Sequence, residues 1–284
     1  MAAAAESPVL VERHDLDVDG AVAVLLRLNR PDQLNPIDDT MLDHLDEHLD
    51  AIERDSAVRT LLVSGAGRAF SAGGDLKKYI ELQRDPVAFP RFVSHLHQTF
   101  GRLRALRVPV VALINGVTAA GGLELVLNCD FAIVADSAKV GDGHLNFGQM
   151  GGGGVLTLLH RAIGKARAIE LLLSGRFLTA AEAVEWGLAS RCVPDDELLA
   201  AGLTFANEVA ARSPLAVANA KQVVHQLWAE NGTVDAGLQV ELERIAAGRS
   251  NLKVVAVDGA DIGYQGHFGA PFEHTVDWLG HKGA

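Results

Sequence analysis

Apolar strand-like stretches alternate with amphipathic stretches in the first half of the chain. Strands are predicted at 21–28, 60–64, 108–114 and 131–135, and the second is mostly apolar, as expected if both its faces are buried. A helix is predicted from about Asp38 to Arg54, with one apolar face formed by Met41, Leu42, Leu45, Leu49 and Ile52. This alternation favours an α/β core with right-handed crossovers.

After about residue 155 the pattern becomes helical. Helices are predicted at 156–172, 179–186, 196–212, 214–230 and 233–247. We therefore expect an α/β core at 1–195 and a C-terminal helical region at 196–284. The last stretch of that region, 250–284, has no clear period and stays unassigned.

Composition and charge narrow the function classes. The 284 residues are 49% hydrophobic, enough for a sizeable core, and the formal net charge of −11 disfavours nucleic acid and anionic lipid as partners. No uninterrupted apolar stretch approaches the roughly 18 residues that span a bilayer, and the amino terminus does not read as a secretory signal. The two cysteines, Cys129 and Cys192, lie in apolar sequence and are expected to be buried free thiols. We expect a cytoplasmic protein.

A first glycine-rich segment, 67–77, follows the strand at 60–64. The small residues 72–74 before Asp75 would let a backbone amide point into a cavity without side-chain obstruction. The segment does not fit a dinucleotide fingerprint, because Phe70 stands where the third glycine is needed, and Ser71 lacks the flanking glycines of a nucleophile elbow. An ordinary glycine turn remains the alternative.

A second segment, 115–125, comes directly off the strand at 108–114 and leads into a helix. Gly121 near the start of that helix would present its amide at the positive end of the helix dipole. Glu124 stands one turn further on in apolar sequence, where a carboxylate is costly unless it is paired, solvated or used. A structural or capping glutamate is the alternative.

A third segment, 140–148, carries His144 in a glycine-rich loop. A histidine in such a loop can reach a site that strands cannot, although a lone histidine is more often structural than catalytic. Asp142 nearby could orient or charge the imidazole, or simply solvate the loop. The sequence shows no spacing typical of metal ligands, so no metal site is expected.

These segments occur with others in a fixed order along the chain. Residues 28–36 read LNRPDQLNP, 72–76 read AGGDL, 115–125 read NGVTAAGGLEL before Cys129-Asp130, and 163–190 contain IGKA, LLLSG and AVEWGL. Together they resemble the crotonase (enoyl-CoA hydratase/isomerase) family over about residues 15–225.

The resemblance implies a fold and an assembly. The family's fold is a spiral of ββα turns followed by a helical trimerisation region, so we expect a homotrimer or a dimer of trimers. The substrate would be an acyl-CoA thioester. No bound cofactor is implied, since coenzyme A is part of the substrate.

The resemblance also implies site residues. The family's oxyanion hole, made of two backbone amides, falls on Gly74 and Gly121, and its first catalytic glutamate falls on Glu124. The residues that bind the substrate and its CoA fall on Ala72, Gly74, Asp75, Leu76, Lys77 and Gly121. Lys77 would be available to the nucleotide phosphates.

The sequence departs from the family in three places. The second glutamate of hydratases, twenty positions after the first, is His144 here, which can still exchange a proton near neutrality. The usual Pro-Gly-Ala-Gly-Gly stretch is altered at 150–154 to Met-Gly-Gly-Gly-Gly, and 250–284 match the family's ending poorly.

Three functions remain after this comparison. The leading hypothesis is an enoyl-CoA hydratase, in which Glu124 positions and deprotonates water and His144 supplies the α-proton. The alternative on the same scaffold is a β-keto-acyl-CoA C–C hydrolase that uses His144 to activate water. A non-catalytic CoA-binding or RNA-binding member is the third, and the charge of −11 weighs against RNA.

Overall fold

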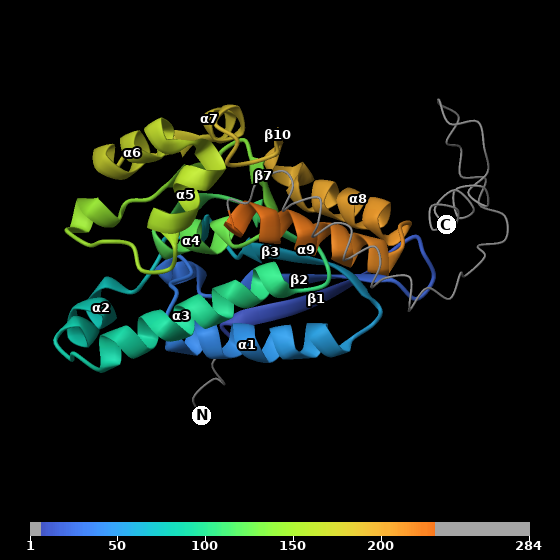
Figure 1. Cartoon of the computed structure of the whole chain (residues 1–284), viewed down its shortest axis with the longest axis horizontal. Coiled ribbons are helices and arrows are strands. Elements are labelled where there is room, and N and C mark those ends of the chain that lie inside the picture. Colours follow the sequence, from blue (N-terminus) through green and yellow to red (C-terminus); the bar gives the residue numbers. More distant parts are fainter. Residues whose placement is uncertain (1–6, 231–284) are drawn as a thin grey trace, which may run out of the picture. The chain divides into compact units, whose positions relative to one another are not determined.

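A six-stranded sheet forms the centre of the computed structural model, which describes residues 7–230 (Figure 1). The strand order is β1-β2-β3-β5-β7-β10. Their bounds are β1 Val9–Asp15, β2 Val22–Leu28, β3 Val58–Gly65, β5 Val110–Ile114, β7 Phe131–Ala135 and β10 Arg191–Val193. β1 is antiparallel to β2 and every other neighbouring pair is parallel, as expected for strands joined by crossovers.

A second sheet of four short strands lies beside the first. It has the order β4-β6-β8-β9, with β4 Ala69–Ser71, β6 Val117–Ala119, β8 Lys139–Gly141 and β9 Leu178–Thr179. β4, β6 and β8 each follow a strand of the large sheet after a short turn, and helical structure follows each of them. The chain therefore repeats a β-β-helix unit, which confirms the predicted mixed α/β fold.

Helices cover the sheets and fill the second half of the described region. Their bounds are η1 Pro31–Gln33, α1 Asp39–Arg54, α2 Leu76–Gln83, α3 Ala88–Ala105, α4 Gly121–Leu127, η2 His144–Phe147, α5 Val155–Ile163, α6 Lys165–Ser174, α7 Ala180–Glu185, η3 Asp195–Glu197, α8 Leu198–Ala210 and α9 Pro214–Glu230. α1 and α3 run side by side (Figure 1), and Arg102 of α3 lies 2.9 Å from Asp46 and 2.6 Å from Asp50 of α1. All five apolar residues predicted for the face of α1 are buried.

The single helix predicted at 156–172 is wrong. Gly164 adopts φ 82, a conformation that glycine tolerates and a helix does not, and it separates α5 from α6. The short strands of the second sheet were not predicted either, because two or three residues are too few to show a period. The helix predicted at 233–247 and the stretch 250–284 lie outside the described residues. The division at residues 195 and 196 stays a prediction.

The core lies on both sides of the large sheet. Along β2, Val24 and Leu26 belong to the cluster that includes α1 and α3, whereas Ala23 and Leu25 belong to the cluster under α8. This alternation follows from the two-residue period of a strand and explains why β2 is apolar throughout.

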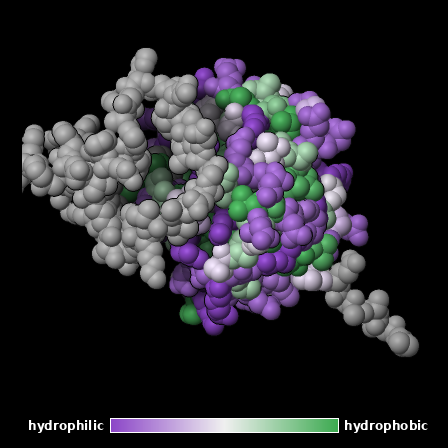
Figure 2. Space-filling view, turned by 90° about the vertical axis from the view of Figure 1, so that its right-hand side faces the viewer, coloured by the Kyte–Doolittle hydropathy of each residue, from purple (hydrophilic) through white to green (hydrophobic). Residues whose placement is uncertain are grey.

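The described region has a surface of mixed polarity and two free cysteines. On the face in Figure 2, hydrophilic residues are interspersed with smaller groups of hydrophobic ones. Cys129 is a buried free thiol as predicted, but Cys192 is only partly buried. Among residues 7–230, no helix is both long enough and apolar enough to cross a membrane.

Candidate active site

The two glycine loops predicted from the sequence lie against each other. A β-carbon at position 73 would lie 2.7 Å from Ala120 Cβ and 3.1 Å from the amide nitrogen of Gly121, so only glycine permits this approach. The amide nitrogens of Gly74 and Gly121 donate no hydrogen bond to another described residue. Two unused donors are thus brought together by loops almost fifty residues apart in the chain.

The first glycine loop is held by the segment that carries the LNRPDQLNP motif. The side-chain Nδ2 of Asn35, a fully buried residue, donates to the carbonyls of Ala66 (3.0 Å), Ala69 (2.8 Å) and Phe70 (3.1 Å). Ser71 Oγ donates to the carbonyl of Asn35 over 2.7 Å. The motif thus fixes the loop, and the Ser71 hydroxyl is occupied by the backbone and does not serve as a nucleophile.

The second glycine loop contains a strained residue. Ala120 has φ 48 and ψ −118, a sparsely populated conformation for a residue with a side chain, directly before Gly121 opens α4. Its amide donates to the carbonyl of Asp142 over 2.6 Å. The bend therefore depends on a contact with the segment that carries His144.

Glu124 is a buried carboxylate, with 1% of its surface exposed. Its Oε1 accepts hydrogen bonds from the amides of Gly153 (2.7 Å) and Val155 (3.3 Å). Burial raises the pKa of Glu124, and Asp142 adds to this, whereas His144 and the two amides oppose it. The net pKa is raised, which gives a carboxylate that is a stronger base than one in water.

His144 begins η2 and is paired with Asp142. Its Nδ1 lies 2.7 Å from Asp142 Oδ1, and its amide donates to Asp142 Oδ2 over 3.3 Å. Burial alone would lower the pKa of His144, but the hydrogen bond to Asp142 and the charges of Glu124 and Asp142 outweigh it, so the pKa is raised. Of the three roles that the sequence left open for Asp142, the geometry fits orienting and charging the imidazole.

Glu124 and His144 both lie against Gly151. A β-carbon at position 151 would lie 3.0 Å from Glu124 Oε1 and 3.3 Å from His144 Cε1. Since the pKa of both groups is raised, the pair holds a proton more readily than either side chain does in water. The arrangement can therefore accept and deliver protons on neighbouring atoms.

Two glycines of the stretch 150–154, Gly151 and Gly153, lie against Glu124, and both are glycine in the family pattern as well. A β-carbon at position 153 would lie 2.5 Å from Glu124 Oε2, 2.8 Å from its Cδ and 2.9 Å from Leu96 Cδ2. At position 151 it would collide with Val155 Cγ1. The backbone at Gly151 and Gly153 thus packs closely against the Glu124 carboxylate. A side chain at either position would not fit.

Tyr79 is a site residue that sequence reasoning missed. Its ring covers Gly74 so closely that a β-carbon there would collide with it, and it packs edge-on against Phe89 and Phe92 at centroid distances of 5.8 and 5.3 Å. Burial, followed by the charges of Glu124 and Asp39, raises the pKa of Tyr79, so the phenol stays protonated. No motif marks this position, because it is set by how α2 folds back on the loop.

The residues expected to grip CoA lie around the start of α2. The amide of Ala72 donates to the carbonyl of Leu34 over 2.9 Å, and Asp75 Oδ1 accepts from the amide of Lys78 over 3.3 Å, which places Asp75 as a cap of α2. The side chains of Leu76 and Lys77 lie outside the described part of the structure. Within residues 7–230, no group of three or more His, Cys, Asp or Glu side chains is placed to hold a metal ion.

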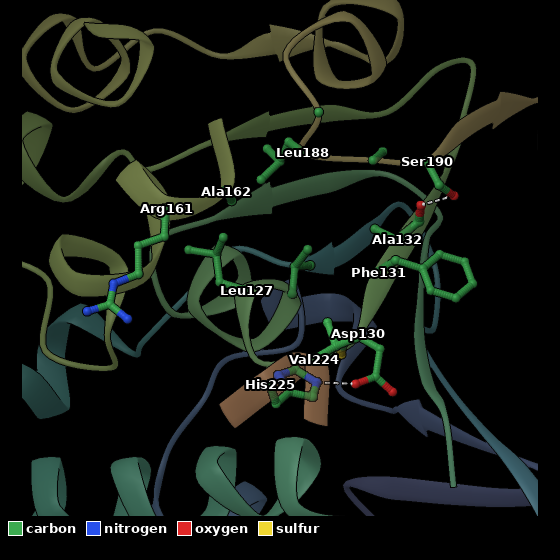
Figure 3. A pocket seen from close by; sticks show the side chains of 14 residues that line it. Leu127, Asp130, Phe131, Ala132, Arg161, Ala162, Leu188, Ser190, Val224 and His225 are labelled. Atoms are coloured by element: carbon green, nitrogen blue, oxygen red, sulfur yellow. Dashed lines mark hydrogen bonds and ion pairs between the residues drawn. The ribbon is translucent and has the colours of Figure 1, made fainter. Parts of the chain in front are cut away.

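A cavity of about 460 Å³ lies elsewhere, between the end of α4, the start of β7, α5, residues 187–190 and α9 (Figure 3). None of the predicted site residues lines it. Asp130 on its wall is paired with His225 Nε2 (2.5 Å) and Lys221 Nζ (3.0 Å), and Ser190 Oγ donates to the carbonyl of Ala132 (3.0 Å). These pairs tie α9 and β10 to the sheet, so we assign them a structural role.

Comparison with known proteins identifies the family of this chain. The sequence pattern of the family described as enoyl-CoA hydratase/isomerase matches residues 18–245. A probable enoyl-CoA hydratase of Mycobacterium bovis is 34% identical over 220 residues, which cover 78% of this chain and 82% of that one.

Two solved structures are also similar. An enoyl-CoA hydratase from Bacillus anthracis has a TM-score of 0.78 at 32% identity, covering 87% of this chain and 92% of that one. A monofunctional enoyl-CoA isomerase from Mycobacterium smegmatis has a TM-score of 0.69 at 31% identity, covering 82% and 99%. The chain therefore belongs to the enoyl-CoA hydratase/isomerase family of enzymes, with the crotonase fold.

Proposed function

We propose that this enzyme is an enoyl-CoA hydratase, which adds water to a 2-enoyl-CoA to give a 3-hydroxyacyl-CoA. The observation that carries the proposal is the buried Glu124 carboxylate, held by two backbone amides and facing the Asp-paired imidazole of His144. A buried carboxylate costs stability unless it is compensated, so its retention beside a second titratable group favours a chemical use over a purely structural one.

The thioester would be activated by the two glycine loops. The free amides of Gly74 and Gly121 would donate to the thioester oxygen as it gains charge in the enolate, which is usually the largest electrostatic contribution in such reactions. Ala72 and residues 74–77 would hold the CoA portion, with Lys77 near its phosphates. We expect no separately bound cofactor, since coenzyme A comes with the substrate.

Two proton transfers would complete the hydration. Glu124 would take a proton from water as the hydroxide oxygen bonds to Cβ, and the electron pair of the double bond would move toward the thioester to form the enolate. His144 would then give its proton to Cα, which restores the thioester carbonyl. A base with a raised pKa and an acid held beside it match these roles.

The test is the absorbance of crotonyl-CoA, whose conjugated thioester absorbs in the ultraviolet. The wild-type enzyme is expected to remove this absorbance and to produce 3-hydroxybutyryl-CoA, identified by chromatography against a standard. Unchanged absorbance with crotonyl-CoA and with longer and bulkier enoyl thioesters would rule out the hydratase.

One specific observation favours a second candidate, a β-keto-acyl-CoA C–C hydrolase. An imidazole paired with a buried carboxylate, as in His144 and Asp142, is the arrangement that activates a nucleophile in many hydrolases. A β-keto thioester supplied in the same assay would then be cleaved to a carboxylate and a shorter thioester. Enoyl isomerisation is less favoured, because the related isomerases rely on a carboxylate where this chain has His144.

We also propose that the enzyme forms a homotrimer or a dimer of trimers, as expected from the family resemblance. A mass in solution of three or six times 30.1 kDa by light scattering is the expected result, and a monomer would contradict it. A role limited to CoA or RNA binding is disfavoured by the buried Glu124 and by the net charge of −11.

A further inference from the structure

Asp142 lies between the two halves of the site. Its backbone carbonyl accepts from the amide of Ala120, the strained residue before Gly121, and its side chain holds His144 at two points. The side chain is 1% exposed, so this carboxylate is taken out of water by the site itself. No hydration step described above uses it.

The geometry fixes which ring nitrogen of His144 is available. Nδ1 lies 2.7 Å from Asp142 Oδ1, and an ionised carboxylate can only accept, so Nδ1 carries a hydrogen. Nε2 has no hydrogen-bond partner among the described residues. With Nδ1 engaged by Asp142, Nε2 is the nitrogen left to exchange protons on the side of the ring near Gly151 and Glu124.

The charged groups around His144 all raise the pKa of its imidazole. Asp142 from the loop after β8 and Glu124 from α4 both favour the imidazolium, against the effect of burial. Tyr79 of α2, which lies close enough to Glu124 to feel its charge, stays neutral and adds no opposing charge. A neutral group at position 142 would therefore leave the imidazole less basic and free to change its tautomer.

We propose that Asp142 is a positioning residue, which keeps Nδ1 of His144 protonated and leaves Nε2 as the proton-exchanging atom. A glutamate at position 144 would need no such partner, since either oxygen of a carboxylate can exchange a proton. An imidazole has two unlike nitrogens and works only when the correct one faces the reaction. Asp142 thereby allows histidine to act at a position where the family has a carboxylate.

The experiment uses ¹⁵N-histidine-labelled enzyme without substrate, with the His144 ring signals assigned by their absence in His144→Gln. In wild type the neutral ring is expected as the Nδ1–H tautomer. In Asp142→Asn, the midpoint of the His144 titration is expected to move to lower pH, since the negative charge that favours the imidazolium is gone. Asp195→Asn, which changes an exposed aspartate at the start of η3 that accepts from Ser137, is the matched control and should leave both signals unchanged.

Kinetics provide a second readout on whichever thioester the enzyme converts. In Asp142→Asn, kcat is expected to fall about 10- to 100-fold, less than the about 10²- to 10⁴-fold loss for the proton-transferring group itself, with KM within about threefold of wild type. The limb of the pH–rate profile that belongs to His144 should move to lower pH.

The outcomes separate this proposal from the proposed function on which it rests. If wild type shows the Nε2–H tautomer, or if Asp142→Asn leaves the titration of His144 unchanged, the proposal is overturned even in an active hydratase. If no enoyl thioester is hydrated but the ring behaves as described, the hydratase proposal fails and the role of Asp142 stands. Should Asp142→Asn not fold, the wild-type tautomer still decides.

Discussion

Replacing Glu124 with Gln is expected to lower the kcat for enoyl-CoA hydration by about 10²- to 10⁴-fold, the usual contribution of a side chain that transfers a proton. Gln has nearly the same shape, and its carbonyl oxygen can still accept from the amides of Gly153 and Val155. The variant should therefore unfold within about 3 °C of wild type, a difference of roughly 1 kcal/mol for a chain of this size. Loss of crotonyl-CoA absorbance and a thermal melt are the two measurements.

The control for Glu124→Gln is Glu170→Gln. Glu170 is an exposed glutamate that pairs with Arg176 at the surface, so the same chemical change there should leave kcat unaltered. If Glu124→Gln retained more than about a tenth of the wild-type kcat, Glu124 would not be the base. For the C–C hydrolase, the same variant would slow the reaction without abolishing it.

Replacing Gly153 with Ala is expected to lower kcat by about 100-fold, the usual cost of misplacing a catalytic group by about 1 Å. The added methyl group would lie 2.5 Å from Glu124 Oε2 and 2.9 Å from Leu96 Cδ2. Leu96 is fully packed, so the carboxylate must move. Overpacking of this kind also costs about 1–3 kcal/mol of stability. Steady-state kinetics and a urea melt measure the two effects.

The neighbouring glycine provides the matched control. A β-carbon at position 152 would lie 3.5 Å from Val93 Cγ2, an ordinary van der Waals contact, so Gly152→Ala should keep kcat within about threefold and stability within about 1 kcal/mol. Equal losses in both variants would show that the stretch only needs backbone freedom. Equal retention in both would mean that Glu124 is not confined by position 153.

These variants together examine one physical idea about the site. Glu124 is buried and His144 is partly buried, their charges support each other, and the backbone at 151–155 and the carboxylate of Asp142 hold them in place. The backbone at 151–155 and Asp142 thus restrict which atoms of Glu124 and His144 can exchange a proton. We expect a site with this organisation to exchange protons near neutrality, because both groups have a raised pKa.

Part of the fold and two candidate site residues could be predicted from the sequence alone. The apolar runs predicted four strands of the large sheet, and the spacing of Met41, Leu42, Leu45, Leu49 and Ile52 predicted the buried face of α1. Glu124 was identified as a candidate because a carboxylate in an apolar helix conflicts with its local surroundings. His144 was identified because a histidine in a glycine-rich loop can reach a site that strands cannot, and the roles of both came from the family resemblance. Such local conflicts are visible in a sequence without any knowledge of contacts.

Other features were decided only by the tertiary structure. The division of the helix predicted at 156–172 depends on one backbone angle at Gly164. The family resemblance related Gly74 to Gly121, but only the structure shows that their loops approach each other at Gly73. The packing of Tyr79 over Gly74 and the wrapping of Glu124 by Gly153 join segments far apart in the chain. Periodicity reports how one segment divides its residues between core and solvent. Periodicity does not show which other segment packs against the buried face. The contacts between such segments set the geometry of the site.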